Sequence, residues 1–198
     1  MAPPIERTIR GGEWEFRDLE RETFRNVLFV DVDLTETVDR GSVFEGCAFR
    51  GVKFNCSVHE EAAFLNCTFT RCSLFDAAFT RCKLTGSVFD GCTYGALKVS
   101  GGDWSFVGLA GADLRGSRFT EVRLREADLT GARLESAELR GCDLSGSWMR
   151  GADLTGCDLR GSGLAVPDLD GARFRGAVID PDQAVAVAQV FGFDVRAG

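Results

Sequence analysis

Residues 127–161 read A-D-L-T-G, A-R-L-E-S, A-E-L-R-G, C-D-L-S-G, S-W-M-R-G, A-D-L-T-G and C-D-L-R-G, which is one five-residue unit repeated seven times. The same register continues in both directions, so that every fifth residue from Trp14 to Ile179 is the centre of a unit. Of these 34 centres, 32 are apolar, and only Asp39 and His59 interrupt the series. Neither a helix nor an ordinary strand has a period of five, so the pattern predicts a repeat architecture.

A second register supports the first, because the residue two positions before each centre is small. From residue 112 onward these residues are Ala112, Ser117, Val122, Ala127, Ala132, Ala137, Cys142, Ser147, Ala152, Cys157 and Ser162. The positions between them are mostly polar or glycine. One five-residue unit cannot bury its apolar side chain by itself, so we expect stacked units that share a continuous core.

The units resemble those of the pentapeptide-repeat family, whose repeat reads A-(D/N)-L-x-x, over about residues 14–179. The resemblance implies an all-β fold, a right-handed quadrilateral β-solenoid. In that fold each unit forms one side, four units form a coil of 20 residues, and the centre and small residues point inward. We therefore expect an N-terminal tail at 1–13, the solenoid at 14–179, and a separate C-terminal segment at 180–198.

Phenylalanine and leucine centres are unevenly distributed. Nine of the 16 Phe residues are centres between Phe24 and Phe89, whereas after Leu109 the centres are mainly Leu. We expect a bulky, stacked aromatic core in the N-terminal part and a slimmer Leu-lined core after it. The segment 95–108 is the weakest repeat, with Leu97 and Gly102 at small-residue positions, and we interpret it as a bend.

The eight cysteines follow the small-residue register. Seven of them occupy the inward position, and only Cys56 lies outside it. A buried free cysteine behaves as a small hydrophobe. With His59 as the only histidine and no close cysteine pair at zinc-ligand spacing, the register favours core cysteines over a metal site. The sequence predicts no metal and no cofactor.

The chain is acidic, with a net charge of −7 and a pI near 4.8. This balance argues against direct nucleic-acid binding, which needs a basic surface. It permits the opposite role, in which carboxylates stand where a partner expects phosphates, or it simply keeps the protein soluble. No apolar run resembles a signal peptide or a membrane span, so we expect a cytoplasmic protein with no membrane partner.

The C-terminal segment leaves the repeat. Asp180-Pro181-Asp182-Gln183 has the pattern of a capped helix start, Gly192 is the expected stop, and residues 193–195 alternate like a short strand. The helix is apolar on nearly all sides, which is more than one coil end can cover. A monomeric cap is one interpretation, and we favour a cap that also forms a homodimer. The expected dimer residues are Ala184, Val185, Val187, Ala188, Phe191, Phe193 and Val195.

Several segments narrow the resemblance to the fluoroquinolone-resistance members of the family, the mycobacterial type and its Qnr relatives. The matching segments are residues 41–44, 86–89, 113–116, 123–126 and 180–188. This resemblance implies a dimer that binds DNA gyrase by mimicking duplex DNA. The unbroken register leaves no room for a long Qnr-type loop. The outward carboxylates expected to face gyrase are Asp113, Asp128, Glu138, Asp143, Asp153 and Asp158.

The two exceptions to the apolar series, Asp39 and His59, are 20 residues apart and so stack in adjacent coils. A buried ion pair is expensive. We therefore predict a local bulge that turns Val38 and Val58 inward and both polar side chains toward water, with a buried pair as the alternative.

No nucleotide-binding or hydrolase motif occurs in the sequence, and we expect no enzymatic activity. The predicted function is to bind DNA gyrase, modulate it, and protect it from quinolones or another gyrase poison. The alternative is a pentapeptide-repeat scaffold with an unrelated protein partner, since one fold can serve many partners.

Overall fold

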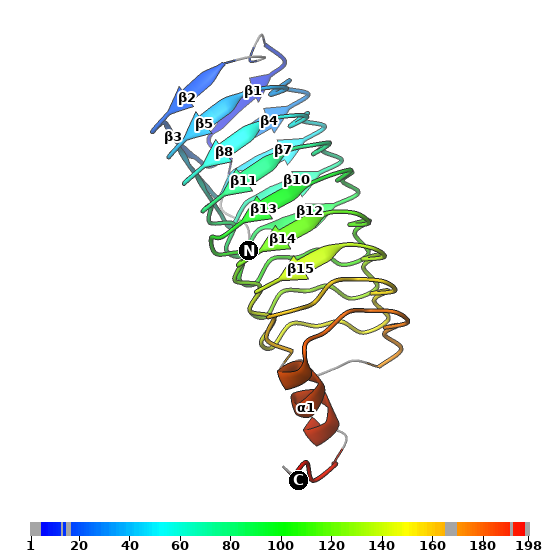
Figure 1. Cartoon of the computed structure of the whole chain (residues 1–198). Coiled ribbons are helices and arrows are strands. Elements are labelled where there is room, and N and C mark those ends of the chain that lie inside the picture. Colours follow the sequence, from blue (N-terminus) through cyan, green and yellow to red (C-terminus); the bar gives the residue numbers. More distant parts are fainter. Residues whose placement is uncertain (1–4, 13, 15–16, 165–169, 191, 197–198) are drawn as a thin grey trace.

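A computed structural model describes residues 5–12, 14, 17–164, 170–190 and 192–196. The chain forms a rod of stacked coils, with a helix projecting from its C-terminal end (Figure 1). All strand pairs are parallel, and each residue pairs with the residue 20 positions further along, as Phe29 does with Phe49. The predicted 20-residue coil and β-solenoid are confirmed.

The longest sheet has seven strands, one from each of seven successive coils. In spatial order these are β15 (Glu138–Arg140), β14 (Arg118–Thr120), β13 (Lys98–Ser100), β11 (Ala78–Thr80), β8 (Val58–Glu60), β5 (Val38–Arg40) and β2 (Asp18–Glu20). Each strand has three residues, and the central one is buried. The central residues are the centres of the sequence register.

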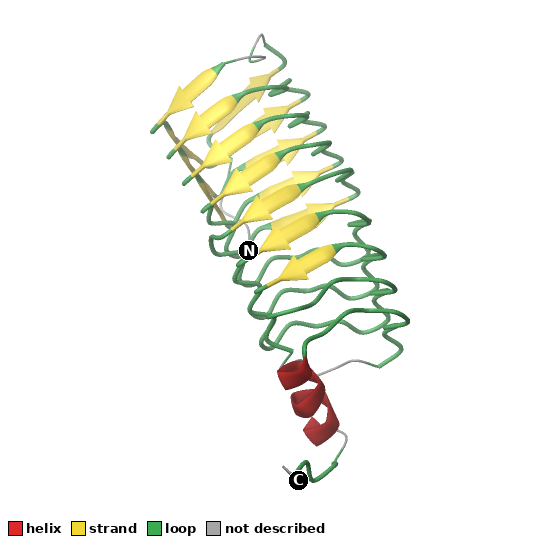
Figure 2. Ribbon diagram, in the orientation of Figure 1, coloured by secondary structure: helices red, strands yellow, loops and turns green. Residues whose placement is uncertain are grey.

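Two further sheets form adjoining sides of the rod. The five-stranded sheet contains β1 (Arg7–Arg10), β4 (Val27–Val30), β7 (Ala48–Arg50), β10 (Thr68–Thr70) and β12 (Val88–Asp90). The three-stranded sheet contains β3 (Thr23–Arg25), β6 (Val43–Glu45) and β9 (Ala63–Leu65). Figure 2 shows these strands in the upper part of the rod and turns in the lower part.

The fourth side, and most of the coils after β15, are held by isolated β-bridges. Examples are the bridges from Asp33 to Lys53 and from Asp153 to Arg173, again 20 residues apart. The spacing is the same as in the sheets, so all four sides continue along the rod even where no full strand forms.

The first coil begins before the predicted boundary. Strand β1 pairs with β4, and Ile9 packs partly buried against the core. Residues 7–10 are therefore part of the solenoid, whereas the sequence register placed them in a tail because Ile9 was not counted as a centre.

The core changes from aromatic to aliphatic along the rod, as predicted. Phe24, Phe44 and Phe64 form one stack, with ring centroids 5.0 and 4.6 Å apart. On the next side, a second stack runs from Phe29 through Phe49 and Phe69 to Phe89, at 4.9, 4.8 and 4.4 Å. Beyond residue 119 the buried centres are leucines and one methionine, up to Leu159.

The weak repeat at 95–108 does not interrupt the sheet. Strand β13 pairs with β11 on one side and β14 on the other, and Leu97 and Trp104 are buried. At Gly102 the backbone has φ +90°, and a Cβ would lie 2.1 Å from the Cys82 carbonyl oxygen. Glycine at this small-residue position is therefore required by the close contact between two coils.

The cysteines lie where the register predicts, and the structure gives all eight as free thiols. Six are buried, Cys92 is half-buried, and Cys56 is exposed at a corner of the rod. The buried thiols fill the small inward positions.

Helix α1 (Pro181–Val190) begins with the predicted capping box. The Gln183 amide donates to the Asp180 carboxylate (3.0 Å), and the Asp180 amide donates to Gln183 Oε1 (2.8 Å). The Gln183 side chain also donates to the carbonyls of Leu159 and Ser162, which ties the helix to the last coils. The strand predicted at 193–195 does not form. Within the part of the chain described here, no helix has the length and apolar character of a membrane span.

Candidate functional site

The six carboxylates predicted to face gyrase are distributed over all four sides of the rod. Each lies directly before a buried centre. Asp113 and Asp153 lie on the bridged fourth side, whereas Glu138 and Asp158 are neighbours on the side of the seven-stranded sheet. Asp143 lies on the side of the three-stranded sheet, and Asp128 on the side of the five-stranded sheet. The structure therefore does not bring the six together.

Five of these six carboxylates have an arginine partner. The nearest pairs are Asp113–Arg115 (2.7 Å), Glu138–Arg118 (3.2 Å), Asp143–Arg125 (2.7 Å), Asp153–Arg173 (2.8 Å) and Asp158–Arg160 (2.7 Å). Hydrogen bonds from the Arg160 guanidinium lower the pKa of Asp158 to about 2. Each of these carboxylates must give up or share its arginine to bind another cation.

Asp128 differs from the other five. It makes no ion pair within 4.0 Å among the described residues, and its Oδ1 accepts a hydrogen bond from the Thr130 amide (3.0 Å). Its neighbours in the adjacent coils are Gly108 and Trp148, which carry no charge. Trp148 is 60% exposed. Asp128 is therefore the candidate most available to an external cation.

Asp39 and His59 form the buried pair, and the predicted bulge is wrong. Their exposures are 0% and 1%, and Asp39 Oδ2 lies 3.1 Å from His59 Nδ1. The His59 ring stacks on Phe79 at 4.7 Å and so continues the aromatic core. The strands on both sides keep their register, because the hydrogen bonds of the pair cost less than displacing Val38 and Val58 from a regular parallel ladder.

Hydrogen-bond donors around His59 fix the proton count of the pair. The Ser57 hydroxyl donates to the Phe54 carbonyl (2.7 Å), so His59 Nε2, 3.1 Å from Ser57 Oγ, must donate to it. A proton must also lie between Nδ1 and Asp39 Oδ2, on one atom or the other. The pair is therefore neutral as a unit, which removes most of the cost of burying two separate charges.

The order Ser57, His59, Asp39 has the connectivity of a hydrolytic triad but not its accessibility. All three side chains are at most 1% exposed, and the serine proton is committed to a carbonyl. A nucleophile must reach a substrate carbonyl, and this hydroxyl faces the core. The arrangement is part of the core packing.

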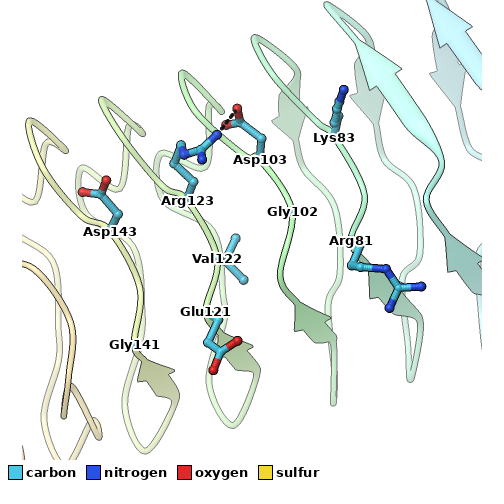
Figure 3. Close-up of a pocket in the computed structure, with 9 residues that line it drawn as sticks. All are labelled: Arg81, Lys83, Gly102, Asp103, Glu121, Val122, Arg123, Gly141 and Asp143. Carbon is cyan, nitrogen blue, oxygen red and sulfur yellow. Dashed lines mark hydrogen bonds and ion pairs between the residues drawn. The ribbon is translucent and has the colours of Figure 1, made fainter.

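A shallow groove of about 600 Å³ crosses the coils beside Gly102 (Figure 3). Its lining residues are Arg81, Lys83, Gly102, Asp103, Glu121, Val122, Arg123, Gly141 and Asp143. Asp103 and Arg123 pair at 2.9 Å, and Arg81 pairs with Glu61 outside the groove. No serine, cysteine or histidine is among these lining residues, and their charges are mixed, so the groove selects no single class of small molecule.

The C-terminal end of the rod exposes a group of apolar side chains. The coil end contributes Phe174 (38%), Val178 (45%) and Ile179 (36%), and the segment after it contributes Val185 (40%), Phe193 (67%) and Val195 (42%). Of the other predicted dimer residues, Ala184 is exposed, Val187 and Ala188 are half-buried, and Phe191 is outside the described residues. The helix projects away from the rod instead of covering its end (Figure 1).

The sequence analysis did not single out the exposed aromatic residues of the coils. Phe75 is 56% exposed, Phe106 55% and Trp148 60%. Each occupies an outward position of the register, where most residues are polar or glycine. An apolar aromatic residue at an outward position was the available signal.

Comparisons with known proteins support the fold over the whole chain. The family described as "Pentapeptide repeats (8 copies)" matches residues 109–146 and 137–179, so the C-terminal coils belong to that family. Three structures of QnrB1, a plasmid-mediated fluoroquinolone resistance protein, are similar to the chain. One trypsin-treated form has a TM-score of 0.83 at 22% identity, covering 96% of this chain and 97% of that one.

The other two QnrB1 structures give lower scores. A second trypsin-treated form has a TM-score of 0.77 at 20% identity, covering 94% of this chain and 99% of that one. The full-length form has 0.55 at 20% identity, covering 94% and 100%. No curated protein sequence matches the chain.

Proposed function

We propose that this chain, a pentapeptide-repeat β-solenoid, binds DNA gyrase in the cytoplasm and protects it from quinolones or another gyrase poison. The observation that carries the proposal is the similarity in fold to QnrB1 along nearly the full length of both chains. QnrB1 is a fluoroquinolone resistance protein, and the subgroup motifs of this sequence independently imply gyrase as the partner.

The charge and shape of the rod are consistent with a competitor of DNA. The net charge is −7, and 34 units at four per coil and ~4.8 Å per coil give a rod about 40 Å long. Joined end to end, two rods would be about 80 Å long, comparable to roughly 24 base pairs at ~3.4 Å each. The proposal needs no catalytic residue and no cofactor.

We also propose that the functional form is a homodimer joined at the C-terminal ends. The coil end and the helix expose apolar side chains that a second copy can bury, and exposed apolar patches of this kind are typical of interfaces. Changing Val185 and Phe193 together to Glu should give a monomer by light scattering. Gln189→Glu adds a charge to an exposed position of the same helix and is the matched control. A monomeric parent protein would refute the dimer.

The gyrase proposal is tested by a supercoiling assay with purified gyrase, with and without a quinolone. We expect the protein to inhibit supercoiling at micromolar excess, to restore activity in the presence of the drug, or to do both. Inhibition should weaken as salt rises, because screening limits electrostatic reach to ~8 Å at physiological ionic strength.

The second candidate function is a scaffold for an unrelated protein. It is favoured by the arginine pairing of five predicted carboxylates, since solvent-exposed charge ladders of this kind also arise without any partner. A purified dimer that leaves gyrase unaffected in both assays would select this function.

A further inference from the structure

Outward charges in this solenoid usually face an opposite charge in the next coil, 20 residues away. Lys53 lies 2.8 Å from Asp33, Arg123 lies 2.9 Å from Asp103, and Arg81 lies 3.0 Å from Glu61. The regular stacking makes this pairing readable from the sequence, because a residue's coil neighbours are 20 positions before and after it.

Three carboxylates on or beside one side of the rod depart from this rule. Asp90 lies between Thr70 and Ala110, Glu126 between Phe106 and Gly146, and Asp128 between Gly108 and Trp148. None of the three makes an ion pair within 4.0 Å among the described residues. They therefore keep their full capacity to pair with cations from another molecule.

The exposed apolar side chains of the coils gather at the same place. Between residues 17 and 164, the large apolar residues with high exposure are Phe75, Val88 (47%), Phe106 (55%) and Trp148 (60%). Three of these four lie with the unpaired carboxylates. We name this surface the Trp148 patch, and it consists of Val88, Asp90, Phe106, Glu126, Asp128 and Trp148.

The fold places these six residues close together. Val88 and Asp90 belong to β12, and bridges connect Val88 to Gly108, Gly108 to Asp128, and Asp128 to Trp148. This column covers three coil steps, about 14 Å at ~4.8 Å per step. Phe106 and Glu126 occupy the corner that leads into the same side, two residues before Gly108 and Asp128.

We propose that the Trp148 patch is the part of the solenoid that contacts the DNA-binding surface of gyrase, an inference that rests on the function proposed above. A surface that holds phosphates presents Lys and Arg side chains. Carboxylates without an internal partner form charge-assisted hydrogen bonds to such cations without breaking an existing pair. Trp148 and Phe106 provide the apolar contact that excludes water from those bonds.

The chemistry of the patch favours a protein over a nucleic acid. Asp90, Glu126 and Asp128 would repel phosphates, and no arginine or lysine lies among the six residues. The five arginine-paired carboxylates on the other sides contribute to net charge and solubility instead.

The test compares two patch variants with two matched controls in the gyrase supercoiling assay. The patch variants are Trp148→Ala and the charge-only triple Asp90→Asn, Glu126→Gln and Asp128→Asn. The aromatic control is Phe75→Ala, which removes a 56% exposed ring from another side. The charge control is the double Asp113→Asn and Asp153→Asn, which removes arginine-paired carboxylates.

We expect each patch variant to need at least about tenfold more protein for half-maximal inhibition, as a central interface residue does. The controls should stay within about twofold of wild type. Circular dichroism and thermal unfolding verify that each variant is folded, and the charge-only triple keeps the test valid if Trp148→Ala does not fold. Asn at 128 retains the acceptor for the Thr130 amide.

The outcomes separate the patch from the proposed function. A wild-type protein that inhibits gyrase, with folded patch variants that inhibit equally well, overturns the patch and leaves the function standing. Controls that lose as much activity as the patch variants also overturn it, because the contact would then involve every side. A wild-type protein without any effect on gyrase overturns both.

Discussion

The coils before residue 90 and those after residue 110 use one repeat but are stabilised differently. Twelve of the fifteen strands in the described residues end by Asp90, and the core there is stacked phenylalanine. The later coils have leucine centres and are held largely by isolated bridges. The register is the same in both, so it determines which residues are inward, whereas the size of the inward residue decides how regular the strands become.

The corners of the rod show a second difference. The corner residues have positive φ. In the earlier coils they are often not glycine, as at Asn66 and Arg71, whereas in the later coils they are mostly glycine, as at Gly131 and Gly151. A left-handed non-glycine residue costs roughly 1–2 kcal/mol. Aromatic pairs worth about 0.5–1.5 kcal/mol each beyond their burial offset this cost in the earlier coils.

The largest expected effect concerns the one polar pair in the aromatic core. His59→Phe leaves the Asp39 carboxylate buried without its partner and should lower the free energy of unfolding by about 3–5 kcal/mol. Adding Asp39→Leu should recover most of that loss, because an unbroken apolar column would then run from Leu19 to Phe79. Chemical denaturation of the two single mutants and the double mutant measures the coupling. Equal stability of His59→Phe and wild type would contradict the neutral-pair assignment.

A reciprocal exchange within one side tests whether the two cores differ in width. Phe44→Leu removes stacked contacts at 5.0 and 4.6 Å and should cost about 1–3 kcal/mol, because each aromatic pair contributes about 0.5–1.5 kcal/mol. Leu124→Phe, on the same side in the slimmer part, should cost about 1–3 kcal/mol by overpacking. Thermal and urea unfolding measure both. If Leu124→Phe stabilises the protein, the later coils have room for aromatic residues and the distinction fails.

Corner substitutions should have smaller effects of opposite sign. Gly131 has φ +64°, and no atom lies within 4 Å of the place that a Cβ would take, so Gly131→Ala adds backbone strain without a clash and should cost about 1 kcal/mol. Arg71→Gly relieves the same strain at φ 52° and should be neutral or stabilising by less than ~1 kcal/mol. Differences in urea midpoint measure both, and a loss at Arg71 equal to that at Gly131 would refute the strain argument.

The smallest effect on stability is expected from modifying the thiols. Cys56 is exposed and should react rapidly with a thiol reagent without changing the unfolding transition. Burial raises the pKa of Cys82 to about 12 and that of Cys142 to about 11, so few of these thiols are in the reactive thiolate form near neutral pH. Mass spectrometry of the labelled native protein should find one fast site. Rapid labelling of most thiols would contradict the register.

Much of the fold is readable from the sequence because the register is strict. The inward centres, the small inward residues such as Cys157, and the capping box of Asp180 and Gln183 all follow from spacing and side-chain size. The buried Asp39–His59 pair was predicted wrongly, because the cost of burying charge was weighed without Ser57, Phe54 and the shared proton. Polar groups that satisfy one another 20 residues apart look like defects when read one at a time.

The candidate site was less predictable than the fold. The six carboxylates were chosen for their outward register, but spacing alone does not show that Asp113 and Asp158 are neutralised by arginines two residues later in the sequence. Reading the sequence at a step of 20 instead of five would have separated Asp128 from the others. It would also have drawn attention to Trp148, its neighbour in the next coil.

The stacking of residues 20 apart has a consequence for how such a chain tolerates insertions and deletions. Removing 20 residues, for example 51–70, deletes one coil, shortens the rod by ~4.8 Å, and leaves every later side chain on its original side. Removing five residues keeps each centre inward but rotates everything downstream by a quarter turn. Trp148 would then leave the side that holds Val88. A frame of five preserves the core, whereas only a frame of 20 preserves the surface.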